Sequence, residues 1–162
     1  MDTFTHKLHT TLRHLRRTRN RVSFAESCTG GKLSARLTEI AGVSDIFMGS
    51  VICYANSAKE DILGVLRETL IKEGAVSEAS ALQMASGAKR VLKSDWAVAI
   101  TGIAGPDGGT KDKPVGTVCF GVVGPNVEYT EKKLFTGQRV QIQEQSAEWA
   151  LEILIAQLAR LE

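Results

Sequence analysis

Several features that often direct a functional assignment are scarce in this sequence of 162 residues. It has only three cysteines, Cys28, Cys53 and Cys119, and they form no CxxC pair. An odd number of scattered cysteines cannot all pair within one chain, which argues against a disulfide framework and against a cysteine zinc site. The sequence therefore indicates a reducing compartment, which we take to be the cytoplasm.

Long hydrophobic runs are also missing. No apolar stretch approaches the roughly 20 residues of a membrane-spanning helix, and the first six residues are too polar for a secretory signal. We therefore expect no membrane partner. The formal net charge is only +2, so the overall charge neither favours nor excludes nucleic acid.

Histidine is confined to the N-terminal region, at His6, His9 and His14. Apolar residues recur there at helical spacing, which predicts an amphipathic helix over residues 3–18 that carries all three histidines. His6 and His9 are spaced to share a metal ion, but no third ligand with suitable spacing is near, so surface histidines are the better interpretation. We expect no metal and no cofactor, and a serine–histidine catalytic pair is disfavoured.

Five arginines crowd into residues 13–21. Such a cluster could bind nucleic acid. A solvated helix face, whose basic end complements the helix dipole, is the simpler explanation and the one we favour. No aromatic residue that could stack on a base is interleaved with the arginines, so nucleic acid is the minority interpretation.

The sequence does contain a regular alternation of apolar strands and amphipathic helices. Strands are expected near residues 22–25, 46–54, 96–100, 115–123 and 127–135, the last two joined as a hairpin. Helices are expected over residues 3–18, 29–40, 57–63, 67–73, 78–92 and 139–160. The last helix is expected to bury Ala147, Ala150, Leu151, Leu154, Leu158 and Leu161. This order predicts an α/β fold, a three-layer α/β/α sandwich with a mixed sheet, formed by a single domain of residues 1–162.

The stretch from residue 22 to residue 37 has the most unusual composition. A short apolar strand runs into Glu-Ser-Cys-Thr-Gly-Gly, residues 26–31, and a helix follows. A turn between a strand and a helix aims backbone N–H groups and the positive helix end at one point, which suits an anion or a developing oxyanion. An ordinary turn capped by Ser27 or Thr29 is the alternative. The phosphate-loop motif of the Walker type fails at two positions, so a P-loop NTPase is not supported.

Ser27 is the candidate nucleophile of this turn, and Lys59 is its candidate base. With Asn56 as the N-cap, Lys59 falls in the first turn of a helix, where a positive charge is disfavoured, and burial near Tyr54 would lower its pKa further. A surface lysine that tolerates the position is the alternative. Cys28 is a rival nucleophile, because a helix N-terminus favours a thiolate, or else a small core residue; we favour Ser27.

Two further segments could contact a ligand. Residues 101–109 form a glycine-rich loop, and glycines let backbone amides approach phosphate or amide oxygens closely. Arg139 stands at the start of the last helix, where its guanidinium and the free N–H groups could hold a phosphate. A solvated arginine is the alternative.

Taken together, four strings of residues resemble the CinA C-terminal domain family in order and spacing over nearly the whole chain. They are Ala25-Glu26-Ser27-Cys28-Thr29-Gly30-Gly31, Tyr54-Ala55-Asn56 followed by Ala58-Lys59, Thr101-Gly102-Ile103-Ala104-Gly105-Pro106-Asp107-Gly108-Gly109, and Lys113-Pro114-Val115-Gly116-Thr117-Val118. The resemblance implies an α/β/α fold, a homodimer, and a nicotinamide mononucleotide deamidase. That amidohydrolase converts nicotinamide mononucleotide to nicotinate mononucleotide and ammonia, in pyridine nucleotide salvage and without a metal.

The resemblance also implies roles for individual residues. Ser27 matches the nucleophile and Lys59 its base, while Tyr54 and Thr101 match polar positions of the pocket, and we place Tyr54 with the catalytic group. We expect the substrate to be bound by Cys28, Thr29, Gly30, Gly31, Asn56, Thr101, Gly102, Gly105 and Arg139. We further infer that the backbone amides after Ser27 form the oxyanion hole.

This sequence departs from the family pattern in two places. Many relatives read Tyr-Ser-Asn-Glu-Ala-Lys where residues 54–59 read Tyr-Ala-Asn-Ser-Ala-Lys. Near the last helix, relatives tend to read Gly-Asp-Arg followed by a second arginine, whereas here Gln138 precedes Arg139 and Gln143 stands at the second position. The alternative to an active enzyme is therefore a catalytically weak or inactive paralogue that acts as a nucleotide-binding module.

Overall fold

The computed structural model describes residues 2–161 and is built around a five-stranded sheet in the order β2-β1-β3-β4-β5. β1 pairs in parallel with β2 and with β3, whereas β4 is antiparallel to β3 and β5. The expected mixed sheet and the hairpin near residue 125 are therefore confirmed. The strands are β1 (Val22–Glu26), β2 (Phe47–Ile52), β3 (Trp96–Gly102), β4 (Thr117–Gly124) and β5 (Val127–Leu134).

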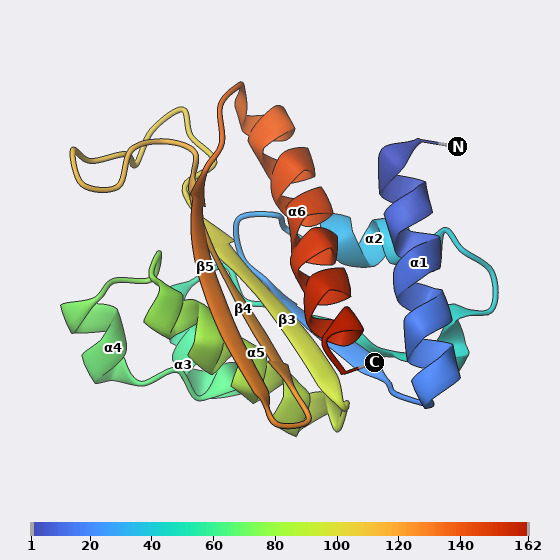
Figure 1. Ribbon diagram of the computed structural model, residues 1–162. Coiled ribbons are helices and arrows are strands. Elements are labelled where there is room, and N and C mark those ends of the chain that lie inside the picture. The colour runs from blue at the N-terminus through green and yellow to red at the C-terminus, as the bar shows by residue number, and fades with distance from the viewer. Residues whose placement is uncertain (1, 162) are drawn as a thin grey trace.

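Helices cover both faces of the sheet, as Figure 1 shows. One face carries α1 (Thr3–Thr18), α2 (Lys32–Thr38) and α6 (Arg139–Ala159), and a short 3-10 helix, η1 (Val43–Asp45), precedes β2. The other face carries α3 (Asn56–Leu63), α4 (Arg67–Lys72) and α5 (Glu78–Leu92). This is the expected three-layer sandwich. α2 is shorter than expected, because residues 27–31 form an irregular turn.

The two faces of the sheet bury side chains of different size. Successive side chains of a strand point to opposite faces, so β3 sends Trp96, Val98 and Ile100 to one core and Ala97 and Ala99 to the other. The larger residues pack under α1, α2 and α6. The alanine face packs against α5, whose buried residues are mostly small, so that helix and sheet approach closely: Ser80, Ala81, Met84, Ala85, Gly87 and Ala88.

The buried side of α6 agrees with the expected one except at its end. Five of the six expected residues are buried. Leu161 is 54% exposed because it lies beyond the last helical residue, Ala159, and so leaves the line of the buried face.

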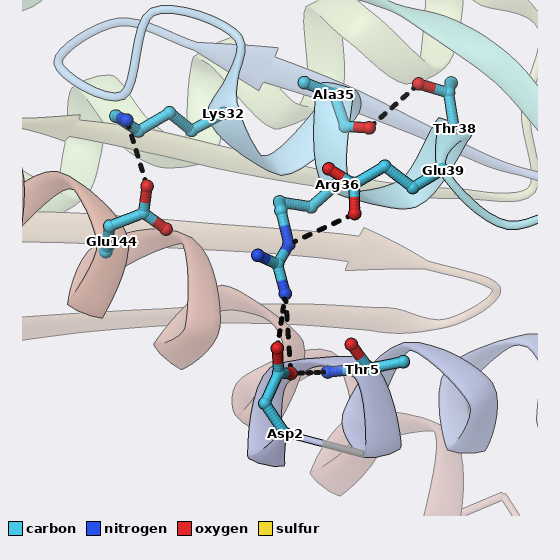
Figure 2. Close-up of polar contacts among 8 residues, drawn as sticks. All are labelled: Asp2, Thr5, Lys32, Ala35, Arg36, Thr38, Glu39 and Glu144. Carbon is cyan, nitrogen blue, oxygen red and sulfur yellow. Dashed lines mark hydrogen bonds and ion pairs between the residues drawn. The ribbon is translucent and has the colours of Figure 1, made fainter.

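Ion pairs tie α2 to the other helices of its layer (Figure 2). Lys32 Nζ lies 3.0 Å from Glu144 Oε1 of α6. Arg36 Nη2 lies 3.1 Å from Oδ2 of Asp2, the N-cap of α1, and the guanidinium stacks 4.6 Å from the ring centroid of Phe4. Exposed ion pairs stabilise only weakly, but these contacts reach α2 from two sides and locate the helix that follows the Ser27 turn.

The close approach of α5 to the end of α3 gives a first prediction. A Cβ atom at Gly87 would overlap the backbone carbonyl of Leu63. Replacing glycine by alanine inside a free helix stabilises it by about 1 kcal/mol. Here we expect Gly87→Ala to lower the free energy of unfolding by about 1–3 kcal/mol instead, because α3 must shift.

Urea unfolding measures this difference, with Ser86→Ala as the matched control. Ser86 is the exposed neighbour on the same helix, and its replacement should change the free energy of unfolding by less than about 0.5 kcal/mol. A Gly87→Ala variant as stable as the wild type would contradict the close packing.

Candidate active site

The candidate site lies at the carboxyl edge of the parallel strands. The β1–β2 connection runs over one face of the sheet through α2, and the β2–β3 connection runs over the other face through α3, α4 and α5 (Figure 1). Open α/β sheets bind ligands where such connections diverge. In register, Glu26 lies between Ile52 of β2 and Ile100 of β3. The residues that follow these three therefore meet at one edge.

A pocket of about 170 Å³ opens at this edge. Ala104 of the glycine-rich loop forms part of its wall, together with two apolar residues that the sequence analysis did not identify, Ala75 and Val76. They carry no polar group, so nothing in the sequence marked them. Of the twelve predicted site residues, eight line the pocket: Ser27, Cys28, Tyr54, Asn56, Lys59, Thr101, Gly102 and Arg139.

Ser27 and Lys59 form a hydrogen-bonded pair inside the pocket. Lys59 Nζ lies 3.1 Å from Ser27 Oγ and also 3.1 Å from the main-chain oxygens of Cys53 and Tyr54. The lysine is only 2% exposed, and in the described part of the chain no carboxylate forms an ion pair with it. Burial lowers the pKa of Lys59, because desolvation penalises the ammonium form.

The three contacts of Lys59 suit a neutral amine. A neutral amine has two N–H donors and one lone pair. The two N–H groups can be donated to the carbonyls of Cys53 and Tyr54, which leaves the lone pair to accept the hydroxyl proton of Ser27. A neutral Lys59 could therefore take the hydroxyl proton of Ser27, as the predicted pairing of base and nucleophile requires. The alternative of a surface lysine is excluded by its burial.

The prediction that Asn56 caps α3 is wrong. The N-cap is Ala55, no side chain caps this helix, and Asn56 is its first residue and lines the pocket. Lys59 still lies in the first turn, and its main-chain N–H donates to Ala55 O at 3.2 Å. Its side chain bends back and donates to the carbonyls of Cys53 and Tyr54, which precede the helix. These contacts explain how a lysine is accommodated at the positive end of α3.

The start of α2 also differs from both sequence interpretations. Neither Ser27 nor Thr29 caps it; the carboxylate of Glu26 accepts the main-chain N–H groups of Leu33 and Ser34, each at 3.0 Å. The positive end of α2 is therefore occupied by a side chain of the chain itself and is not open to an external anion. A carboxylate just before a helix is a common partner for its first amides, and this signal could have been read from the sequence.

The backbone N–H groups in the turn of Ser27 differ in their acceptors. The main-chain N–H of Ser27 donates to Ile100 O and that of Gly30 donates to Ser27 O, both at 3.0 Å. Within residues 2–161, the N–H groups of Cys28 and Thr29 donate to no main-chain oxygen, and both residues are buried. Cys28 lines the pocket and Thr29 does not, so of these two residues it is Cys28 whose N–H is suited to receive a negatively charged oxygen there.

Cys28 is not arranged as a nucleophile. Burial raises the pKa of its thiol to about 12, so the thiolate is scarce at neutral pH. Its carbonyl oxygen accepts a hydrogen bond from Gln143 Nε2 at 3.0 Å. The residue therefore packs as a small buried side chain, one of the two interpretations left open by the sequence.

Arg139 joins three walls of the pocket. It is the first residue of α6, after the N-cap Gln138. Its Nη1 donates to Gly105 O at 2.6 Å, and its Nη2 donates to the Tyr54 hydroxyl at 2.9 Å. Tyr54 is 62% exposed, so this pair forms the outer rim. A guanidinium held at the mouth is well placed to bind a phosphate or carboxylate.

Four of the predicted residues, Thr29, Gly30, Gly31 and Gly105, do not line the pocket. Thr29 donates its hydroxyl to Glu26 Oε1 at 2.8 Å, and Gly105 supplies the carbonyl that holds Arg139. Gly30 and Gly31 adopt positive φ angles of 59° and 103° in the turn, a conformation that favours glycine. Their contact with a substrate stays a prediction. Thr101 lines the pocket while its hydroxyl donates to Ala75 O at 2.9 Å.

The three histidines lie on α1, away from this pocket. Among residues 2–161, no three His, Cys, Asp or Glu side chains come together as metal ligands. In the same part of the chain, no helix is both long enough and apolar enough to cross a membrane.

Comparison with known proteins agrees with this architecture. The family model for the CinA C-terminal domain matches residues 5–158. A CinA-like protein of Fervidobacterium nodosum is 50% identical over 82% of this chain and 33% of its own length, and one of Syntrophobacter fumaroxidans is 53% identical over 83% and 32%. The chain thus spans about a third of the length of these curated relatives.

Solved structures match the chain over nearly their full length. The competence/damage inducible protein CihA from Agrobacterium tumefaciens is 40% identical, with a TM-score of 0.93 and coverage of 96% of both chains. The competence damage-inducible protein A (ComA) from Klebsiella pneumoniae is 32% identical, with a TM-score of 0.95 and coverage of 99% of this chain and 100% of that one. The chain belongs to the CinA C-terminal domain family.

Proposed function

We propose that this chain hydrolyses the carboxamide of nicotinamide mononucleotide to give nicotinate mononucleotide and ammonia. The observation that carries the proposal is the buried Ser27–Lys59 pair, whose atoms Oγ and Nζ lie 3.1 Å apart. A serine and an uncharged lysine form a nucleophile–base pair suited to acyl transfer. The main-chain N–H of Cys28, beside the serine in the pocket, would supply the second requirement of that reaction.

The chemical steps follow from the positions of these groups. Lys59 takes the proton of Ser27 as Oγ attacks the carboxamide carbon, and the N–H group of Cys28, which lines the pocket, faces the oxyanion. Lys59 then gives the proton to the departing amine, which leaves as ammonia with a Ser27 ester behind. A water molecule, deprotonated by Lys59, attacks the ester carbon. The bond from that carbon to Ser27 Oγ then breaks, Lys59 returns the proton to Oγ, and the acid is released. Each step uses the lysine alternately as base and as acid.

The dimensions of the pocket support a mononucleotide substrate. A volume of about 170 Å³ suits one flat aromatic carboxamide better than a whole nucleotide. The ribose and phosphate would then lie at the mouth, beside Arg139 and Tyr54. A cation at that place favours a substrate with a phosphate over one without it.

Substrate discrimination by Arg139 gives a second prediction. We expect ammonia release to be faster from nicotinamide mononucleotide than from nicotinamide riboside or free nicotinamide. Arg139→Ala should raise the KM for the mononucleotide about tenfold to hundredfold, because a charge-assisted contact worth about 1.5–3 kcal/mol is lost. The KM for the riboside should change little.

An enzyme-coupled ammonia assay with all three compounds tests this. Arg67→Ala is the matched control, since Arg67 lies on α4, does not line the pocket, and pairs at the surface with Glu60. Equal losses for mononucleotide and riboside would show that Arg139 supports the pocket wall and does not bind the phosphate.

A second candidate is a nucleotide-binding module without turnover, and Gln143 favours it. By resemblance to the family, this position often carries an arginine. Here it carries a neutral amide, which donates a hydrogen bond to the carbonyl of Cys28. Saturable calorimetric binding of nicotinamide mononucleotide with no ammonia after long incubation would support the module. Ammonia formed in proportion to enzyme concentration would support the amidohydrolase.

A further inference from the structure

We infer that Glu26 is a positioning residue, which sets the geometry of the Ser27–Lys59 pair without touching substrate. The inference rests on the proposed function for its activity readout, but its structural argument depends only on the turn. The carboxylate is 0% exposed and is not among the residues that line the pocket. It therefore acts through its neighbours.

The Glu26 carboxylate closes the turn from the inside. Oε1 accepts the Thr29 hydroxyl at 2.8 Å and the Leu33 N–H at 3.0 Å. Oε2 accepts the Ser34 N–H at 3.0 Å and the Ser34 hydroxyl at 2.5 Å. Four donors from the turn and from the first turn of α2 thus converge on one side chain at the end of β1. They hold the two ends of residues 27–31 at a constant separation.

The charge of Glu26 is compensated without a cation. In the described part of the chain, no lysine or arginine pairs with it; its partners are two hydroxyls and two amides at the positive end of a helix. Hydrogen bonds to an ionised acceptor are about twice as strong as neutral ones. A neutral amide of the same shape would accept less strongly and would face the N–H donors with its own NH₂ group.

The main chain of Glu26 is linked to Lys59 through Cys53. Its carbonyl oxygen accepts the Cys53 N–H at 2.9 Å, and the Cys53 carbonyl in turn accepts from Lys59 Nζ. The residue that follows Glu26 is Ser27 itself. One residue therefore anchors the turn that carries the nucleophile and the strand end that carries a carbonyl ligand of the base.

Loss of the Glu26 contacts is expected to lower the rate of the reaction without weakening substrate binding. If the carboxylate no longer gathers its four donors, the turn can relax and the Ser27–Lys59 contact loses its alignment. A misplacement of about 1 Å can reduce a rate about 10²-fold. Arg139, Tyr54 and most of the other residues that line the pocket lie outside this turn, so substrate affinity should be preserved.

The test compares Glu26→Gln, Ser34→Ala and Ser34→Thr with the wild type. We expect Glu26→Gln to lower kcat for nicotinamide mononucleotide about tenfold to hundredfold, with KM within about twofold. Ser34→Ala removes one donor and should lower kcat about threefold to tenfold, while Ser34→Thr keeps the hydroxyl and should stay closer to the wild type. Thr38→Ala is the matched control, because its hydroxyl bonds Ala35 O at the other end of α2 (Figure 2).

A second readout does not depend on the substrate. The rate at which an organophosphorus fluoridate labels Ser27, followed by intact mass, reports how well the serine is activated. We expect it to fall in Glu26→Gln and Ser34→Ala in the same order as kcat. If the wild type is labelled but releases no ammonia, the proposed function fails, and the labelling rates still test the role of Glu26.

Three outcomes would overturn the inference. Unchanged kcat and labelling in Ser34→Ala and Glu26→Gln would show that the turn keeps its geometry without these bonds. A raised KM with unchanged kcat would place the effect on binding. Equal rate losses in Ser34→Ala and Thr38→Ala would reveal a general weakening of α2. Should Glu26→Gln fail to fold, the Ser34 variants decide the question alone.

Discussion

Ser27→Ala will abolish ammonia release and leave the fold intact. The hydroxyl is the attacking group in the proposed reaction, and it is hydrogen-bonded to Lys59. Loss of a catalytic serine typically costs about 10³-fold or more in kcat. The free energy of unfolding should change by less than about 1–1.5 kcal/mol, the range of one net hydrogen bond. Ammonia assays and urea unfolding of the purified variant measure both quantities.

The matched variant for this experiment is Cys28→Ala, which removes the neighbouring thiol. Because burial raises the pKa of that thiol to about 12, we expect the variant to retain activity within about tenfold of the wild type. The calorimetric affinity of Ser27→Ala for the mononucleotide should also persist. An active Ser27→Ala together with an inactive Cys28→Ala would reverse the assignment of the nucleophile.

Lys59→Met will also eliminate turnover, since methionine fills a similar space without a basic nitrogen. Lys59→Arg should be inactive as well, because a guanidinium stays protonated in proteins and cannot act as the base. In the wild type, kcat should rise with pH through the folded-state pKa of Lys59, which burial places below 10.5. A pH–rate profile that is unchanged in Lys59→Met would contradict the role of this lysine.

The same lysine makes stability depend on pH in a direction that can be stated in advance. The pKa of Lys59 is lower in the folded chain than the ordinary value of 10.5, which applies to the unfolded chain. At a pH between the folded-state and unfolded-state pKa, the unfolded chain therefore binds a proton that the folded chain does not. Stability then rises with pH in this window. As the pH falls from about 10.5, the wild type should lose stability relative to Lys59→Met, by about 1.4 kcal/mol per unit of pKa difference, until the folded-state pKa is passed.

A second energy contribution must be separated from this one. Methionine leaves the carbonyls of Cys53 and Tyr54 without the Lys59 donor, which costs about 1–3 kcal/mol at every pH. Only the pH-dependent part of the difference therefore reports the buried amine. Urea unfolding of both proteins at several pH values isolates it. A difference that stays constant from neutral pH to pH 10 would contradict a lowered pKa.

Much of the fold follows from local patterns. The fully apolar run of β3 predicts a central strand covered on both faces, and every residue from Trp96 to Thr101 is buried there. The helical spacing of apolar residues predicts α1 within its observed bounds, Thr3–Thr18. Such periodicities reflect which side of an element faces the core, so they carry over to the structure without knowledge of its neighbours.

The sequence predicted which side chains could take part in the chemistry of the candidate site, but not how they are arranged in space. A lysine near the start of a helix and a serine in a strand-to-helix turn could be recognised as unusual, but they are 32 residues apart, and Arg139 meets the Tyr54 hydroxyl across 85 residues. Their contact depends on the parallel pairing of β1, β2 and β3, which aligns the ends of strands that are distant in sequence.

The irregular turn after β1 shows where local reasoning ends. Its composition by itself indicated a site where a strand passes into a helix, and the strand and helix are present as expected. Which group occupies the helix end was decided by the tertiary structure, because Ser27, Thr29 and Glu26 can all reach main-chain N–H groups from a turn of this length. Packing places the Glu26 side chain inward, where a buried carboxylate needs several donors. The Ser27 hydroxyl, which caps no helix, therefore forms its hydrogen bond with Lys59. This pair makes the turn the candidate active site.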